Sequence, residues 1–204
     1  MTINLYKNDL PNDFNISHRA LAIDTETMGL NPIRDRLCLV QISTGDGDAH
    51  LVQFDDDNYE APNLKKLLTD PNSTKIFHFA RFDIAVLYYY LDIMLTPLFC
   101  TKIASRLTRT YTDRHGLKDL CREVLDVEIS KQQQSSDWGA ETLSEEQLHY
   151  AAADVLYLHQ LKTHFDSVLE REDRTELAQK CFELIPTRDK LELLGWYEDD
   201  IMSH

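Results

Sequence analysis

Long hydrophobic runs, paired cysteines and an excess of positive charge are all missing from this sequence of 204 residues. No apolar run approaches the roughly 20 residues that a membrane-spanning helix needs, so we expect no membrane contact. The first eleven residues have neither the basic region nor the apolar stretch of a secretory signal peptide. The sequence therefore predicts a protein that is neither inserted in a membrane nor exported.

The four cysteines are scattered along the chain and form no Cys-x-x-Cys pair. They are Cys38, Cys100, Cys121 and Cys181. This spacing argues against a structural zinc site and is typical of reduced thiols, so we expect a cytoplasmic protein.

Positive charge is scarce, because 21 lysines and arginines stand against 35 aspartates and glutamates, which gives a net charge of −14. A long polyanion such as nucleic acid would be repelled by this chain unless metals or local basic patches intervene. Either the partner is not nucleic acid, or the protein holds it over a short length.

The residues that are present predict an α/β protein with a mixed sheet. The hydrophobic fraction of 43% is ordinary for a globular protein, and the length fits one domain with a buried core. Apolar segments bounded by turn residues predict strands, the first three as an antiparallel meander, at 20–23, 37–42, 50–54, 75–79 and 98–100. Helical patterns predict helices at 63–68, 82–91, 101–109 and 117–125.

The clearest helix start is the capping-box pattern formed by Ser144 and Gln147. From there apolar residues recur at helical spacing from Leu148 to Phe165. This stretch predicts a long helix with an apolar stripe.

The last part of the chain continues the helical pattern past Glu170, with an interruption at Pro186. We expect a first domain at 1–170 and a C-terminal helical extension at 171–204. The extension would pack on that domain or on a neighbouring subunit. The pair Trp196-Tyr197 would suit a subunit contact or a surface on which a neighbour's substrate stacks.

The residues that carry chemistry begin with Asp24 and Glu26, directly after the apolar run at 20–23. Because they are two residues apart on a strand, their carboxylates point to the same face, at a strand end where open α/β sheets bind ligands. A carboxylate pair held there is unfavourable unless a cation lies between the two groups. A divalent metal ion would satisfy both, although an acidic pair alone is a weak signal in so acidic a chain.

Three more side chains extend this pair. Asp83 falls in the first turn of the helix after strand 75–79, where a lone aspartate is also typical of a helix N-terminus. Asp154 and Tyr150 are four residues apart, about 40° from each other on a helical wheel, and border the apolar stripe. Four converging carboxylates would repel one another, whereas two Mg²⁺ ions about 3.5–4 Å apart would turn them into a site for phosphoryl displacement.

The motifs Asp24-x-Glu26, Asp83 and Tyr150-x-x-x-Asp154 are similar to the three motifs of the DEDD superfamily of 3′→5′ exonucleases, in its tyrosine branch. The resemblance implies a ribonuclease H-like exonuclease fold, with a mixed five-stranded sheet flanked by helices and a C-terminal helical tail. It also implies a 3′→5′ exoribonuclease that releases 5′-phosphomonoesters.

The surrounding sequence resembles ribonuclease D over about residues 18 to 165. The segments that carry this likeness are 36–42, Asp137-Trp138 and 143–155. Ribonuclease D also has C-terminal helical domains that bind nucleic acid, and the sequence ends about where these would begin.

His149 lies five residues before Asp154, so the spacing of the histidine branch is satisfied as well. If Ser144 caps the helix, His149 points about 140° away from Asp154, whereas Tyr150 shares the face of Asp154. We therefore predict Tyr150 as the functional residue and His149 as an exposed one.

The resemblance implies roles for the five motif residues. Asp24 would bridge two Mg²⁺ or Mn²⁺ ions, with Glu26 and Asp154 on the ion that activates water. Asp83 would hold the second ion near the leaving oxygen, and Tyr150 would orient the attacking water or help to deprotonate it. Replacing Asp24 by alanine is expected to abolish activity while the fold stays intact.

Substrate contacts are predicted for residues beside these motifs. Thr27, Met28 and Leu30 would line the pocket of the terminal nucleotide, with loop packing as the alternative. His78, Lys131 and Arg109 would approach phosphates, with a core histidine, a solvated loop and a decorated helix pair as the alternatives.

The acidic surface favours substrates of two to several nucleotides over long RNA. A single domain with a short helical tail resembles the nanoRNase C group of small-RNA exonucleases. The resemblance implies a homo-oligomer that acts on short RNA with a free 3′ end, with DNA left open. The alternatives are a general ribonuclease D-type enzyme that trims RNA or DNA 3′ ends, and a non-catalytic nucleic-acid-binding module.

Overall fold

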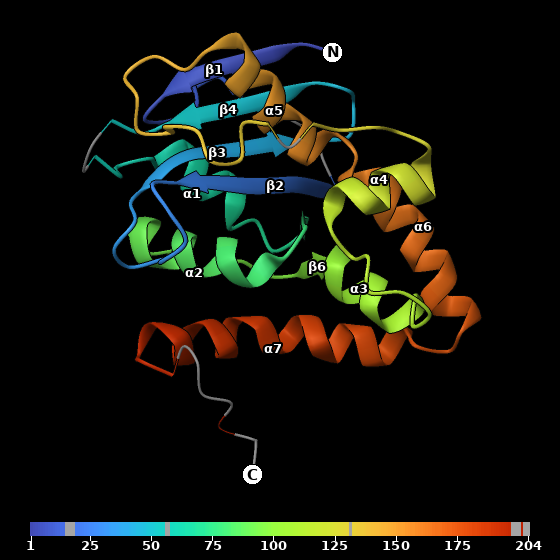
Figure 1. Ribbon diagram of the computed structural model, residues 1–204. Helices are drawn as coiled ribbons and strands as arrows, with labels where there is room; N and C mark the ends of the chain where they lie inside the picture. Colours follow the sequence, from blue (N-terminus) through green and yellow to red (C-terminus); the bar gives the residue numbers. More distant parts are fainter. Residues whose placement is uncertain (15–18, 56–57, 131, 197–200, 202–204) are drawn as a thin grey trace.

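A six-stranded mixed sheet forms the centre of the computed structural model, which describes residues 1–14, 19–55, 58–130, 132–196 and 201 (Figure 1). The strands, in chain order, are β1 (Ile3–Lys7), β2 (Ala20–Thr27), β3 (Leu37–Ser43), β4 (Ala49–Gln53), β5 (Thr74–Phe77) and β6 (Leu98–Cys100). Their order across the sheet is β1-β4-β3-β2-β5-β6. The pairs β2–β3 and β3–β4 are antiparallel, which confirms the predicted meander, and β5 and β6 continue the sheet in parallel.

The sheet has one strand more than the five predicted, because β1 pairs in parallel with β4 at the sheet edge. None of its five residues is fully buried. An edge strand without a buried face lacks the apolar run from which the other strands were predicted. The α/β class with a mixed sheet is confirmed.

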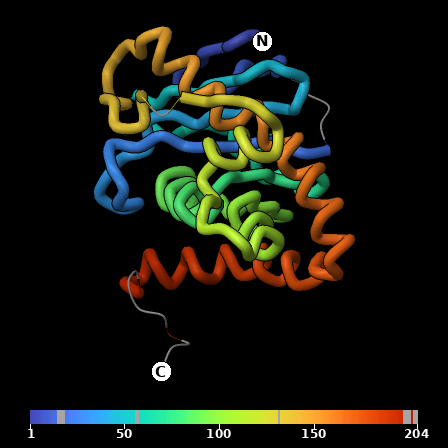
Figure 2. The backbone as a smooth tube through the Cα atoms, turned by 45° about the vertical axis from the view of Figure 1, so that its right-hand side comes forward, coloured from blue at the N-terminus to red at the C-terminus, as the bar shows by residue number. Residues whose placement is uncertain are grey.

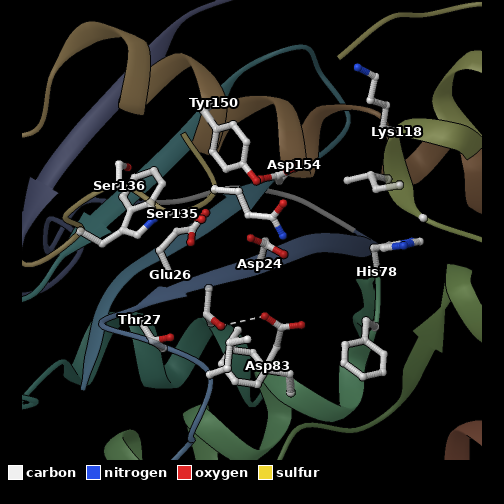
Figure 3. A pocket seen from close by; sticks show the side chains of 18 of the residues that line it. Asp24, Glu26, Thr27, His78, Asp83, Lys118, Ser135, Ser136, Tyr150 and Asp154 are labelled. Atoms are coloured by element: carbon white, nitrogen blue, oxygen red, sulfur yellow. Dashed lines mark hydrogen bonds between the residues drawn. The ribbon is translucent and has the colours of Figure 1, made fainter. Parts of the chain in front are cut away.

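Seven helices surround the sheet in the part of the chain that the structure describes. They are α1 (Pro62–Leu68), α2 (Ala80–Leu91), α3 (Thr101–Thr108), α4 (Leu117–Leu125), α5 (Glu145–Leu156), α6 (Leu158–Arg171) and α7 (Thr175–Leu193). In Figures 1 and 3, α5 lies on one side of β2 and α2 on the other. All seven residues of β3 are buried, as expected for a central strand that is covered on both faces.

The capping box that begins α5 is confirmed, because the Ser144 hydroxyl accepts from the Gln147 N–H and the Gln147 amide oxygen accepts from the Ser144 N–H. The single long helix expected beyond it is wrong. The chain turns at Tyr157, so that α5 ends at Leu156 and α6 leaves in a new direction (Figure 1). The apolar stripe runs across this turn without a break, which is why the sequence pattern did not reveal it.

Helix α7 lies along α2 and α3, on the side of the molecule opposite to β1 (Figures 1 and 2). The interruption expected at Pro186 is wrong, because the helix continues through it. The buried face of α7 stabilises the helical turn around Pro186. Phe182 packs on Phe99 of β6, with ring centroids 4.9 Å apart, and Ile185 is also buried. The division at residue 170 stays a prediction.

All four cysteines are free thiols, three of them buried and Cys181 half-buried. Among the described residues, no helix combines the length and the apolar character that crossing a membrane requires.

Candidate active site

Strand β2 carries the first two carboxylates to the edge of a cleft. Asp24 pairs with Gln41 of β3 and Glu26 with Leu39, and a register shift follows between Glu26 and Thr27. Because side chains alternate along a strand, Asp24 and Glu26 share the face that α5 covers. Figure 3 shows both carboxylates beneath this helix.

Helix α5 contributes Asp154 and Tyr150, whose polar ends meet above the two strand carboxylates (Figure 3). One ligand oxygen from each of Asp24, Glu26 and Asp154 can be chosen so that all three lie within 4.8 Å of one another. The Tyr150 hydroxyl donates a hydrogen bond to the Asp154 carboxylate. Hard carboxylate oxygens at this spacing are suited to Mg²⁺ or Mn²⁺.

Asp83 reaches the cleft from the opposite side of β2, out of the first turn of α2 (Figure 3). Thr25 faces that side, and its hydroxyl donates a hydrogen bond of 2.7 Å to Asp83 Oδ1. Both side chains are buried, so this bond fixes the direction of the Asp83 carboxylate. The fourth acid is therefore held apart from the cluster of Asp24, Glu26 and Asp154, as a second, neighbouring ligand would be.

Burial and mutual repulsion raise the pKa values of these acids. Burial raises the pKa of Asp24 to about 7, and burial together with the charges of Asp24, Asp154 and Asp83 raises the pKa of Glu26 to about 10. The pKa of Asp83 is raised by burial and then by Asp24. Burial and the charge of Asp154 also raise the pKa of Tyr150 above its ordinary value. The donor set thus favours either neutral acids or a bound cation, and a divalent ion fits it.

The five motif residues lie in a cleft of about 620 Å³, which has two chemically different ends. At one end, which we call the polar end, lie Thr27, Ser135 and Ser136 (Figure 3). At the other, the basic end, lie His78 and Lys118 (Figure 3), and Lys102 also lines the cleft. Figure 3 shows the carboxylates between these two ends.

The structure brings four of the six predicted substrate residues to the cleft, namely Thr27, Met28, Leu30 and His78. Met28 and Leu30 are exposed, and His78 Nδ1 lies 2.9 Å from the Thr101 hydroxyl. Met28 passes so close to Gly139 that a Cβ at Gly139 would clash with its sulfur, so the glycine lets the two loops approach.

The structure corrects the expectation for Arg109, which does not reach the cleft. Arg109 is 5% exposed, and its guanidinium binds the carboxylate of Glu123 and donates to the Arg114 carbonyl oxygen at 2.7 Å. An arginine used in this way holds helices and a loop together. The predicted phosphate contact at Lys131 lies outside the described residues.

Tyr150 rather than His149 faces the cleft. His149 is exposed, and its ring nitrogen Nδ1 lies 2.7 Å from the Glu145 carbonyl oxygen on the outer side of α5. Trp138 packs against the Tyr150 ring, with centroids 5.9 Å apart, and is almost fully buried.

Several cleft residues were not predicted as substrate contacts from the sequence. They are Phe79, Phe82, Lys102, Ser135, Ser136 and Trp138. Lys118, which belongs to the basic stretch with Arg106, Arg109 and Arg114 that the sequence offers as a possible backbone contact, also lines the cleft. Gln147 fixes the loop that carries Ser135, Ser136 and Trp138, because its amide nitrogen donates to the Ser136 hydroxyl at 3.2 Å and to the Asp137 carbonyl at 3.0 Å. Phe79 and Phe82 could have been predicted as cleft residues, because they lie four residues and one residue before Asp83. Lys102 could not, because only the sheet topology brings it to the cleft.

Comparison with known proteins agrees with this geometry. A family model described as 3′-5′ exonuclease matches residues 5–170. Ribonuclease D from Jannaschia sp. is 32% identical over 167 residues, which are 78% of this chain and 43% of the relative. The chain spans about two fifths of the length of the ribonuclease D relatives that it matches.

Two solved structures of NrnC from Brucella melitensis are similar over the whole chain. The structure with bound Mg²⁺ is 60% identical with a TM-score of 0.95, and covers 100% of both chains. The structure bound to pGG is 61% identical with a TM-score of 0.96, and covers 100% of this chain and 99% of the other.

Proposed function

Because the chain belongs to the 3′-5′ exonuclease family, we propose that it is a metal-dependent 3′→5′ exoribonuclease for short oligoribonucleotides, down to dinucleotides. It would hydrolyse the terminal phosphodiester and release 5′-mononucleotides. The observation that carries this proposal is the cluster of Asp24, Glu26 and Asp154 oxygens within 4.8 Å, beside Asp83, in a cleft with a basic end.

Two divalent ions, Mg²⁺ or Mn²⁺, are the cofactors that the donor set supports. Asp24, Glu26 and Asp154 would hold one ion and Asp83, with Asp24, the other. When bound, the ions supply the Lewis acidity that activates water and the charge that stabilises the leaving oxygen. The similarity to NrnC with bound Mg²⁺ supports this assignment.

Tyr150 acts as a hydrogen-bond donor in this proposal. Since its pKa is raised by burial and by Asp154, its phenol is protonated at neutral pH. It therefore orients the attacking water beside Asp154 and does not take its proton. Trp138 supports the ring from the side and so fixes the position of the hydroxyl.

The two ends of the cleft set the direction of the substrate. The 3′-terminal nucleoside carries no further phosphate on its 3′ side, so it suits the polar end, where Thr27, Met28 and Leu30 lie. Phosphates on the 5′ side of the cleaved bond suit the basic end, with His78 and Lys118.

A preference for short RNA follows from the charge balance and from a similar protein. A protein of net charge −14 can hold few phosphates, and NrnC, 61% identical, has been solved with pGG. General ribonuclease D-type trimming of RNA or DNA ends is the alternative, supported by the ribonuclease D relatives. A non-catalytic binding module is less well supported, because it would not need all four carboxylates.

A homo-oligomer in the cytoplasm completes the proposal. Trp196 is 43% exposed after the end of α7 and would suit a subunit contact, while Tyr197 lies outside the described residues. The mass of the native particle tests the assembly.

The decisive experiment incubates the purified protein with Mg²⁺ or Mn²⁺ and end-labelled RNA and DNA of two to about twenty residues. We expect 5′-mononucleotides, released fastest from the shortest RNA and not at all with EDTA. Equal rates at all lengths would favour general trimming, and binding without product would favour the non-catalytic module.

A further inference from the structure

Gln41, in the middle of β3, is a fully buried polar residue whose amide has no partner. Neither its Nε2 nor its Oε1 atom makes a hydrogen bond to any part of the chain that the structure describes. A buried amide that gives up water without gaining a hydrogen bond is unfavourable, and such groups are rare in folded proteins. An apolar side chain of similar size would suit this position better, because every residue of β3 is buried. Packing alone therefore does not explain the glutamine.

The register of the sheet places Gln41 directly beside Asp24. The two residues are cross-strand partners in the antiparallel pair β2–β3. Directly opposite residues of such a pair project to the same face, with Cβ atoms roughly 4.5–5.5 Å apart. The register shift of this pair lies beyond Glu26 and leaves the partnership unchanged. The Gln41 amide and the Asp24 carboxylate are therefore neighbours on the face that α5 covers.

The other surroundings of Gln41 on this face offer few groups that could bind its amide. On β4, its direct partner is Leu51. Helix α5, which packs on β2, β3 and β4, has three buried apolar residues and one buried glutamine: Ala151, Ala152, Val155 and Gln147. Both amide atoms of Gln147 already make hydrogen bonds. The polar neighbours that remain are Asp24, directly opposite, and Gln53, which is diagonal to Gln41 because it pairs with Leu39.

Two of the neighbouring carboxylates already have a neutral side-chain donor. The Thr25 hydroxyl donates to Asp83 at 2.7 Å, and the Tyr150 hydroxyl donates to Asp154. Asp24 accepts a hydrogen bond from the backbone N–H of Thr25. Donors of this kind orient metal-ligating carboxylates and strengthen metal binding. A glutamine amide would do the same for Asp24 without a positive charge that competes with the ions.

We propose that Gln41 is a positioning residue of the metal site, whose Nε2–H donates a hydrogen bond to the Asp24 carboxylate when the ions are bound. This inference rests on the proposed function and deepens it, because it names the residue that orients the carboxylate shared by both ions. In the protein without ions the buried amide is unfavourable, and the bond to Asp24 offsets this cost once the ions bind. Ion binding and the stability of the ion-free protein should therefore respond to Gln41 in opposite directions.

The test compares Gln41→Met and Gln41→Leu with the wild type, with Gln53→Met as the matched control. Gln53 is another buried glutamine on the same face, but its amide nitrogen donates to the Ala140 carbonyl oxygen at 2.8 Å. The dissociation constants of Mg²⁺ and Mn²⁺ are measured by isothermal titration calorimetry without substrate. The unfolding midpoint is measured in EDTA, and kcat and KM for a dinucleotide are measured over a range of Mg²⁺ concentrations.

We expect both Gln41 variants to raise the dissociation constants of the ions about tenfold or more. In EDTA, Gln41→Met should raise the unfolding midpoint by about 2–10 °C, because the unpartnered amide is gone. KM for the dinucleotide should stay within twofold of the wild type, and saturating Mg²⁺ should restore most of kcat, since Gln41 acts through the ions. A residue that serves only the fold would instead lower the midpoint and leave ion binding unchanged.

Gln53→Met should lower the unfolding midpoint, because it loses a hydrogen bond, and should leave the dissociation constants of the ions within twofold. The proposal is overturned if both Gln41 variants bind the ions as the wild type does, or if Gln53→Met weakens ion binding as much as they do. It is also overturned if the wild type binds neither ion. If the wild type binds the ions but releases no nucleotide, the proposed function fails instead, and the ratios of the dissociation constants still test Gln41.

Discussion

Two groups of buried acids in this protein are handled in opposite ways. In the catalytic cleft, the charges that raise the pKa of Glu26 are three other carboxylates, those of Asp24, Asp154 and Asp83. Between α2 and α7, the buried Glu192 lies 2.6 Å from the guanidinium of Arg81, and Arg81 and Arg188 also lower the pKa of Asp189, although burial keeps it raised at about 8. In the second group Glu192 also raises the pKa of Asp189, and two arginines offset part of this negative charge, whereas the charges that act on Glu26 are all negative.

The difference shows what each group is for. A fold that needs only stability pairs a buried acid with an arginine, as α2 and α7 do, because an isolated buried charge is strongly unfavourable. A cluster left with its own repulsion stays unfavourable until a cation from solution enters. The cleft therefore requires a bound cation, and substitutions in the two groups of acids should have different effects on activity and on stability.

The largest effect is expected for Asp24→Asn. Removing one carboxylate from the cluster should lower kcat by about 10³-fold or more, since metal binding supplies several kcal/mol of transition-state stabilisation. In EDTA the variant should be at least as stable as the wild type, because a repulsive charge is gone. Asp189→Asn is the matched control and should keep full activity. Substantial turnover by Asp24→Asn would contradict the metal assignment.

The second effect concerns stability against pH at the α2–α7 contact. An unfolded aspartate has a pKa near 4 and loses its proton above that pH, whereas Asp189 in the folded protein holds its proton up to about pH 8. Between these values the unfolded state binds fewer protons, so the free energy of unfolding falls as the pH rises. Asp189→Asn lacks this loss, and in saturating Mg²⁺ its advantage over the wild type should grow by on the order of 3 kcal/mol from pH 5 to pH 8.

Urea unfolding at both pH values measures this advantage. The cleft acids contribute equally to the free energy of unfolding of both proteins, so their contribution cancels in the difference. An advantage that stays the same at the two pH values would mean that Asp189 is ionised in the folded protein throughout. Arg81 and Arg188 would then compensate the charge of Asp189 in full.

The third effect is the stabilisation of the cleft by its ion. At a Mg²⁺ concentration of 100 times the dissociation constant, binding to the folded state should add about 2.7 kcal/mol, which raises the unfolding midpoint by about 5–10 °C. Asp189→Asn should gain as much as the wild type, whereas Asp24→Asn should gain little. Equal gains in all three proteins would show that the ion stabilises a place other than the cleft.

Features that depend on local residue patterns could be predicted from the sequence. The motif acids and Tyr150 lie on local patterns, a strand end and one face of a capped helix, and the structure brings them together as expected. Helix α4 was predicted with the bounds that it has, because Gly116 precedes an amphipathic stretch. Short-range geometry is written in residue spacing.

Features that depend on distant partners were not visible in the sequence. Arg109 resembled a phosphate ligand, but Glu123 and the Arg114 carbonyl occupy it. Strand β1 has no buried face of its own, and α7 continues through Pro186 because packing on β6 holds the turn. Lys102 joins the cleft only because β6 leads α3 to the edge beside His78.

The smallest effect is expected at Thr25, which binds a buried carboxylate of the cleft as Arg81 does between α2 and α7, but without a positive charge. Its hydroxyl donates a hydrogen bond of 2.7 Å to Asp83 Oδ1, so a neutral donor orients this carboxylate without neutralising its charge. Thr25→Val keeps the shape and removes the donor, which should lower kcat about tenfold and raise the Mg²⁺ concentration for half-maximal activity. Thr25→Ser should restore both values. If Thr25→Val lowered stability but left the Mg²⁺ requirement unchanged, the hydrogen bond would stabilise the fold and would not orient a metal ligand. Its role would then match that of the Arg81–Glu192 pair between α2 and α7.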